Sequence, residues 1–296
     1  MKLFKGSGVA IVTPFKGGYV DYEKMTELIK WHIEEGTDAI VVAGTTGESA
    51  TLSKAEKLEL FEHSMKVSEG KIQIIAGTGS NNTLDSIALS VEAEKLGVHG
   101  LLLVTPYYNK PSQRGLYAHY KAIAEAVSIP VILYNVPGRT SVDLRPETVI
   151  ELSKIPNILG LKEASGDVAR IRPLAEALPA HFMIYAGNDG EIFDVLESGG
   201  HGVISVLANI LPKEVHKITE DYFNGNIEGA RKSQDSYQKL IDALFSDTNP
   251  VPVKEAMNLM GMEVGGFRLP LVEMDEEHHH KLIEVLKEYG LLKDVN

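Results

Sequence analysis

The chain has 296 residues, of which 44% are hydrophobic, and its formal net charge is −12. This length suits one α/β barrel as well as two ordinary domains. The acidic balance argues against nucleic acid or an anionic membrane as a partner, and the absence of cysteine excludes disulfides and thiolate chemistry. Residues 1–12 lack the apolar core of a signal peptide, and no apolar run reaches membrane-spanning length, so we expect a cytoplasmic protein.

One pattern recurs from residue 9 to about residue 206: a run of β-branched residues ends in a Gly, Thr, Pro or Asn cluster, and an amphipathic stretch follows. The predicted strands are 9–13, 39–43, 72–76, 100–105, 131–135, 158–163, 182–186 and 202–206. The predicted helices are 22–35, 54–68, 83–96, 113–127, 146–154, 168–177, 191–198 and 212–224. Eight such units predict a (β/α)8 TIM barrel. The alternative, an open doubly wound sheet, is disfavoured because no Gly-x-Gly-x-x-Gly follows the first strand.

Further helical stretches follow the barrel, at about 227–245, 253–260 and 276–289. No linker rich in Gly, Ser or Pro separates them from it, so we expect a barrel over 1–224 and a C-terminal helical extension over 225–296. The extension contains His278, His279 and His280. We interpret them as surface residues of an amphipathic helix, with weak metal binding as the alternative.

The predicted strand 158–163 carries a lysine, Lys162, next to its last residue. Alternation along the strand would place Ile158, Gly160 and Lys162 on one face and Leu159, Leu161 and Glu163 on the other. A buried ammonium is costly, and one resolution is a neutral amine that can attack a carbonyl. The alternative is a lysine that reaches solvent or pairs with Glu163.

The predicted strand ends, which form the active-site face of such a barrel, carry hydroxyl groups, glycine-rich turns and an arginine. The turns at 44–48 and 77–79 could hold an anion, a carboxylate rather than a nucleotide, or could simply be tight turns. Tyr134 could relay protons or could pack in the core with its hydroxyl satisfied. Arg139 could bind a substrate carboxylate or could be a solvated loop residue. These strand ends show no spacing typical of a metal site.

Four motifs resemble those of the dihydrodipicolinate synthase and N-acetylneuraminate lyase superfamily. They are Gly-Thr-Thr-Gly-Glu-Ser at 44–49, Thr-Pro-Tyr-Tyr-Asn at 105–109, Tyr-Asn-Val-Pro-Gly-Arg-Thr at 134–140 and Gly-Leu-Lys-Glu-Ala-Ser at 160–165. Members are class I, Schiff-base-forming barrels that use pyruvate. Arg139 resembles the synthase branch, which implies condensation of pyruvate with L-aspartate 4-semialdehyde to 4-hydroxy-tetrahydrodipicolinate in the diaminopimelate route to lysine. The resemblance implies no cofactor and no metal.

The resemblance also implies roles for individual residues. Lys162 would form the imine, and Thr45, Tyr134 and Tyr108 would relay protons. Thr46 would hold the pyruvate carboxylate and Arg139 the semialdehyde carboxylate, while Gly187 and Ile204 would shape the floor of the pocket. In the family the tyrosine matching Tyr108 reaches into the neighbouring subunit's site, which implies a homodimer as the complete unit, and two dimers commonly form a tetramer.

Many members are inhibited by lysine, bound at the dimer interface by residues that match Ser49, Ala50, Asn81 and Tyr107. The most sensitive members carry histidine or another compatible group where this chain has Lys54 and Lys57. Because an ammonium repels a cationic ligand, we predict weak or absent inhibition by lysine.

Two other functions remain open. One is a class I aldolase or lyase that acts on a sugar-derived 2-keto acid, against which Arg139 argues. The other is a non-catalytic binding protein on the same fold, which would have little reason to keep the lysine, the threonine pair and both tyrosines together.

Overall fold

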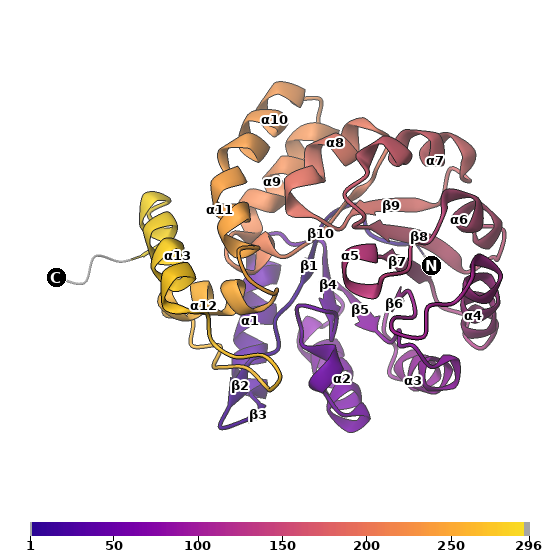
Figure 1. Ribbon diagram of the computed structural model, residues 1–296, viewed down its shortest axis with the longest axis horizontal. Helices are drawn as coiled ribbons and strands as arrows, with labels where there is room; N and C mark the ends of the chain where they lie inside the picture. Colours follow the sequence, from indigo (N-terminus) through magenta and orange to yellow (C-terminus); the bar gives the residue numbers. More distant parts are fainter. Residues whose placement is uncertain (1, 293–296) are drawn as a thin grey trace.

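The computed structural model describes residues 2–292 and contains a closed barrel of eight parallel strands (Figure 1). The barrel strands are β1 (Gly6–Ala10), β4 (Ala39–Val42), β5 (Gln73–Gly77), β6 (Gly100–Val104), β7 (Val131–Asn135), β8 (Ile158–Glu163), β9 (Met183–Ala186) and β10 (Gly202–Ser205). Each pairs with its neighbours in chain order, and β1 closes the ring between β4 and β10. The predicted TIM barrel is confirmed.

Helices follow the strands and cover the outside of the barrel. They are α1 (Tyr22–Glu34), α2 (Lys54–Ser68), α3 (Thr83–Lys95), α4 (Gln113–Glu125), α6 (Pro146–Leu152), α7 (Ile171–Ala177), α8 (Ile192–Glu197) and α9 (Pro212–Phe223). Local chemistry sets several boundaries. Ser53 and Glu56 form a reciprocal capping box at the start of α2, and the glycines after α1 and α3, Gly36 and Gly97, both have φ +84°.

Three local features differ from the sequence prediction. The first strand begins at Gly6 rather than residue 9, and beyond it the Val12 N–H bonds to the Asn209 side chain instead of continuing the sheet. A short hairpin of β2 (Phe15–Lys16) and β3 (Tyr19–Val20) was not predicted; its turn is Gly17-Gly18, both with positive φ. A one-turn helix after β7, α5 (Pro137–Thr140), was also not predicted.

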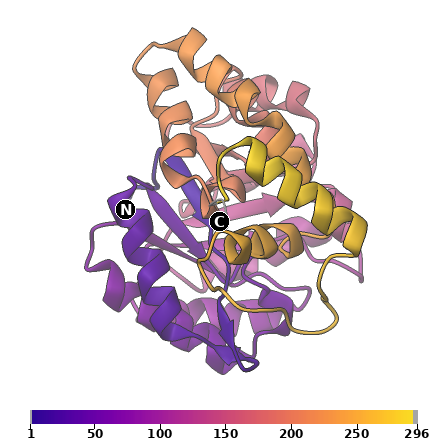
Figure 2. The ribbon, with the colours of Figure 1, turned by 90° about the vertical axis from the view of Figure 1, so that its left-hand side faces the viewer.

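Within residues 225–292, the C-terminal extension forms four helices rather than three. They are α10 (Ile227–Ser236), α11 (Gln238–Leu244), α12 (Val251–Leu259) and α13 (Glu276–Glu288). The predicted helix 227–245 is divided at Tyr237, whose φ of −101° and ψ of 0° leave the helical range. Figure 2 shows α12 and α13 side by side against the barrel, and buried residues of the extension share one apolar cluster with those of the barrel helices.

The three consecutive histidines lie on α13. His280 is exposed and the other two are half-buried; His278 and His279 pair with Asp275 and Glu255. No helix within residues 2–292 has the length and apolar character needed to cross a membrane.

The core has two layers, one inside the barrel and one between the barrel and its helices. The β7–β8 register shifts, so that Val131 pairs with Ile158 but Ile132 pairs with Gly160. Gly160 and Lys162 therefore face the barrel interior, whereas Ile158 belongs to the outer layer. The predicted common face for Ile158 and Lys162 is wrong, because the bulge inserts one residue between them.

Candidate active site

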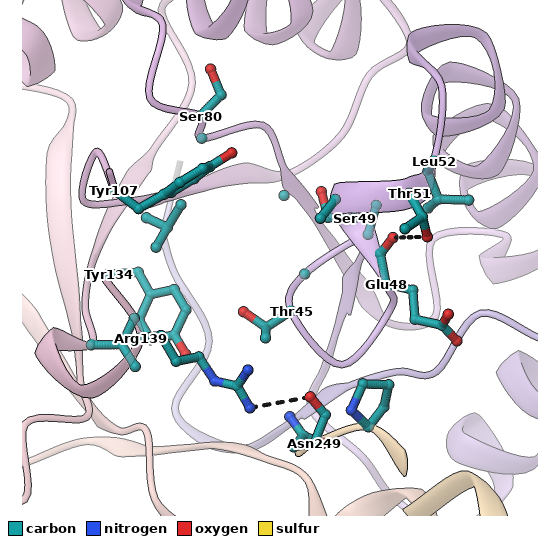
Figure 3. Close-up of a pocket in the computed structure, with 18 of the residues that line it drawn as sticks. Thr45, Glu48, Ser49, Thr51, Leu52, Ser80, Tyr107, Tyr134, Arg139 and Asn249 are labelled. Atoms are coloured by element: carbon teal, nitrogen blue, oxygen red, sulfur yellow. Dashed lines mark hydrogen bonds between the residues drawn. The ribbon is translucent and has the colours of Figure 1, made fainter. Parts of the chain in front are cut away.

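A pocket of about 390 Å³ opens at the carboxyl ends of the strands (Figure 3). Its walls come from the turn after β4, the ends of β5 to β7, helix α5 and two segments of the C-terminal extension. Among the predicted site residues, those that line it are Thr45, Ser49, Ala50, Lys57, Tyr107, Tyr134 and Arg139. In Figure 3 the side chains of Thr45, Tyr134 and Arg139 converge on the same space.

The turn at residues 44–48, hereafter the threonine turn, carries the two adjacent threonines. Thr45 is half-buried and lines the pocket, whereas Thr46 is buried. Close packing explains the glycines around the turn: a Cβ on Gly77 would lie 2.3 Å from the Ala43 carbonyl oxygen. The Thr13 hydroxyl donates to the Gly47 carbonyl at 2.7 Å, which ties the turn to the segment that follows β1.

Lys162 is enclosed at the end of β8, with only 5% of its surface exposed. The strand register places it opposite Tyr134 on β7, and its Nζ lies 4.5 Å from the centre of the phenol ring. Glu163 points to the other side of the sheet, where it contacts Asn135 and Arg170. Lys162 therefore neither reaches solvent nor pairs with Glu163, which removes the alternative interpretation of this lysine.

A chain of hydrogen bonds joins the mouth of the pocket to the threonine turn. Arg139 is exposed at the mouth, and its Nη2 donates to the Asn249 carbonyl at 3.1 Å. The Asn249 side-chain amide donates to Thr46 Oγ1 at 3.0 Å. Asn249 lies just before α12, so the C-terminal extension forms part of this pocket (Figure 3).

Sequence and structure comparisons agree on what this chain resembles. The family model described as "Dihydrodipicolinate synthetase family" matches residues 3–289. The chain belongs to the dihydrodipicolinate synthetase family. A 4-hydroxy-tetrahydrodipicolinate synthase from Thermoanaerobacter sp. is 51% identical over 297 residues, covering 100% of each chain. The family predicted from the four motifs is thus confirmed.

Solved structures of the family share the whole fold. The dihydrodipicolinate synthase of Aquifex aeolicus has a TM-score of 0.96 and is 43% identical, covering 98% of this chain and 100% of its own. The enzyme of Acinetobacter baumannii, solved in complex with pyruvate, has a TM-score of 0.95 and is 46% identical, covering 97% and 99%. Both alignments include the C-terminal extension as well as the barrel.

Two residues predicted from the family to shape the pocket floor, Gly187 and Ile204, are not among the residues that line the pocket. Ile204 is fully buried on β10 and belongs to the inner apolar cluster that also contains Tyr134. Gly187 follows β9, and its N–H donates to the Glu163 carbonyl at 2.7 Å. A Cβ on Gly187 would lie 2.6 Å from that of Ala164, so the position requires glycine.

Two buried carboxylates, Asp189 and Glu163, lie near Lys162; the sequence suggested a role only for Glu163, as a possible partner of the lysine. Asp189, after β9, accepts from the Ser205 hydroxyl and from the N–H groups of Val206 and Leu207. Burial raises the pKa of Asp189, while these hydrogen bonds and the Lys162 charge oppose that rise. Burial likewise raises the pKa of Glu163. For Asp189 the sequence signal was a polar turn directly after a strand.

The remaining predicted residues lie along the outer edge of the pocket or beyond it. Tyr108 is 90% exposed, with φ +71°, and does not reach the pocket of its own chain. Tyr107 lines the pocket, and its carbonyl accepts from the Asn81 side-chain amide at 3.2 Å. Lys54 is exposed, whereas Lys57 is half-buried, and this burial lowers the pKa of Lys57.

Proposed function

We propose that this chain is a Schiff-base synthase that condenses pyruvate with L-aspartate 4-semialdehyde to 4-hydroxy-tetrahydrodipicolinate, in the diaminopimelate route to lysine. The observation that carries the proposal is the enclosed Lys162 beside Tyr134, a residue that lines the pocket with Arg139 at its mouth. Full-length relatives with this activity in their names support it.

The first half of the reaction builds a nucleophile on the enzyme. The Lys162 amine, in its unprotonated form, attacks the ketone carbon of pyruvate, and the resulting carbinolamine loses water to give an imine. Loss of a proton from the methyl group then gives an enamine. Tyr134 and Thr45 are suited to move the protons of these steps, because both side chains face the pocket and Tyr134 lies next to the lysine strand. The threonine turn offers hydroxyl and N–H groups to the pyruvate carboxylate, with Thr46 held by Asn249.

The second half forms the carbon–carbon bond and releases the product. The enamine carbon attacks the aldehyde of the semialdehyde, whose oxygen takes up a proton and becomes the product hydroxyl. The semialdehyde's own amine then attacks the imine carbon, closes the ring and displaces the Lys162 amine. Arg139 supports recognition of the semialdehyde carboxylate because its planar fork lies at the mouth, with one donor directed to Asn249.

We further propose that the complete unit is a homodimer in which Tyr108 enters the partner's site, with a tetramer as a dimer of dimers. The Tyr108 side chain is exposed, and its backbone has a positive φ. A positive φ is unfavourable for tyrosine, so a contact outside its own chain would have to stabilise this conformation. Leu84 and Tyr107 add exposed apolar surface to the chain.

Trapping with borohydride tests the proposed chemistry directly. Incubation with pyruvate and borohydride, followed by peptide mass spectrometry, should give a reduced adduct on Lys162. An unmodified chain would support a non-catalytic binding protein instead. A panel of aldehydes would then separate the synthase from an aldolase that uses sugar-derived substrates, because only the synthase turns over rapidly with L-aspartate 4-semialdehyde.

A further inference from the structure

A buried ion pair joins the threonine turn to the C-terminal extension. The Lys254 Nζ on α12 lies 2.8 Å from Glu48 Oε1, and both side chains are completely removed from solvent. In Figure 3 the Glu48 carboxylate points away from the centre of the pocket. Glu48 thus lines the pocket, while its carboxylate, which forms the pair, is directed away from the pocket centre.

Lys254 connects three separate parts of the chain. Besides Glu48, its ammonium donates to the Thr13 carbonyl at 3.1 Å and to the Gly266 carbonyl at 2.5 Å. The second Glu48 oxygen accepts the Arg268 N–H at 3.2 Å. The three lysine donors are thus matched by three acceptors, which is the condition under which a buried ammonium is tolerated.

The same helix contacts the threonine turn at a second point. Asn249, just before α12, donates to Thr46, whereas Lys254 holds Glu48 at the far end of the turn. Glu48 has φ +55°, a left-handed conformation that is unfavourable for glutamate and must be stabilised by its contacts. Thr45, whose hydroxyl faces the pocket, therefore lies in a turn that is fixed from behind.

We propose that Lys254 and Glu48 are positioning residues, whose ion pair holds the threonine turn so that the Thr45 hydroxyl is correctly placed for proton transfer. This inference rests on the proposed function. Stability alone does not explain the pair, because buried ion pairs can often be replaced by apolar residues of similar volume without loss of stability. A small displacement of a catalytic group, by contrast, is costly to the reaction rate.

The test compares three variants, Glu48→Gln, Lys254→Met and the double variant E48M/K254M, with the wild type. The measurements are Tm, kcat, the KM of each substrate and the rate at which borohydride traps the pyruvate adduct. The kinetic and trapping assays are run at a temperature well below the lowest Tm. Asp38→Asn is the matched control, because it removes the carboxylate partner of His216 at the opposite end of the barrel.

We expect E48M/K254M to keep a Tm near that of the wild type while kcat and the trapping rate fall by about tenfold or more. The KM for the semialdehyde should stay within about twofold, because α5 carries Arg139. The D38N control should have a lower Tm than the wild type and an unchanged kcat.

A folded double variant with wild-type kcat and trapping rate would overturn the inference. If the double variant does not fold, the kcat and trapping rate of Glu48→Gln decide by the same criteria. A wild type that forms no adduct would instead overturn the proposed function.

Discussion

Lys162 and Tyr134 lie opposite each other on neighbouring strands, with the lysine Nζ 4.5 Å from the centre of the phenol ring. This pairing is a property of the barrel itself, because both residues are fixed by the β7–β8 register rather than by a loop. A nucleophile and a proton-transfer group held on adjacent strands keep their separation through the several proton transfers that imine chemistry requires.

The first prediction concerns this pair. Lys162→Met should abolish the pyruvate adduct and lower kcat at least about a thousandfold, because the nucleophile is lost. Tyr134→Phe should still form the adduct but lower kcat by about 10²–10⁴-fold, because only proton transfer is impaired. Tyr120→Phe is a matched control: this buried tyrosine bonds the Leu103 carbonyl outside the barrel, so its loss should affect Tm alone. Wild-type turnover by Tyr134→Phe would contradict the role assigned to the phenol.

The second prediction concerns substrate selection at the pocket mouth. Arg139→Ala should raise the KM for L-aspartate 4-semialdehyde by about 10–100-fold, the effect of losing a charge-assisted hydrogen bond. Trapping with pyruvate alone should be unchanged, since the imine forms deeper in the barrel. Arg145→Ala is the control, because that arginine is also exposed and lies six residues further along. An equal rise in the KM values of pyruvate and the semialdehyde would argue against a specific contact between Arg139 and the semialdehyde carboxylate.

The sequence predicted the parts of the site that depend on local pattern. Strand ends could be located from apolar runs and the turns that follow them, and a parallel barrel brings those ends to one face. Lys162, Tyr134 and Thr45 were found in this way, together with the motifs of the family. The bulge at residue 159 was not found, because one extra residue leaves no distinct trace in an apolar run.

Residues distant in the sequence escaped prediction for a different reason. Asn249 and Thr46 are 203 positions apart, and Lys254 and Glu48 are 206 apart, so no spacing links them. In the sequence, Asn249 lies between two predicted helical stretches and Lys254 lies within the second of them. Their roles follow from the docking of α12 onto the barrel, which is decided by tertiary packing.

The third prediction concerns inhibition by the pathway's end product. L-lysine at low-millimolar concentration should leave the steady-state rate unchanged, because Lys57 lines the pocket beside Ser49 and its ammonium repels a cationic ligand. Lys57→Gln should show greater inhibition than the wild type, whereas Lys66→Gln, further along the same helix, should not. Inhibition of the wild type at or below low-millimolar lysine would contradict the prediction.

The fourth prediction tests whether subunits share their sites. Tyr108→Phe and Lys162→Met chains, each of low activity alone, should regain up to about a quarter of wild-type activity when mixed under conditions that exchange subunits. In such a hybrid, one site combines the intact Lys162 of one chain with the intact Tyr108 of the other. Light scattering should show a dimer or larger assembly. A monomer with full activity, or mixtures without recovery, would rule out the shared site.

The fifth prediction concerns stability at acidic pH. His32 on α1 is completely buried, and burial lowers its pKa from 6.5 to about 3. Between these two values the unfolded chain binds the proton and the folded chain does not, so stability falls as the pH is lowered. His32→Gln should therefore flatten the pH dependence of the free energy of unfolding below about pH 6.5, by up to about 1.4 kcal/mol per pH unit.

His216 gives a control of opposite sign for this experiment. Its hydrogen bond to Asp38 raises the pKa of His216, so its contribution is complete below pH 6.5 and is lost as the pH rises through the higher folded-state value. His216→Gln should thus cost stability mainly at acidic pH, whereas His32→Gln should relieve acid sensitivity. Chemical denaturation of both variants at pH values from about 4 to about 8, a range that includes the pKa of free histidine, measures this difference in the free energy of unfolding. Parallel curves for the wild type and His32→Gln would show that His32 does not stay neutral in the fold.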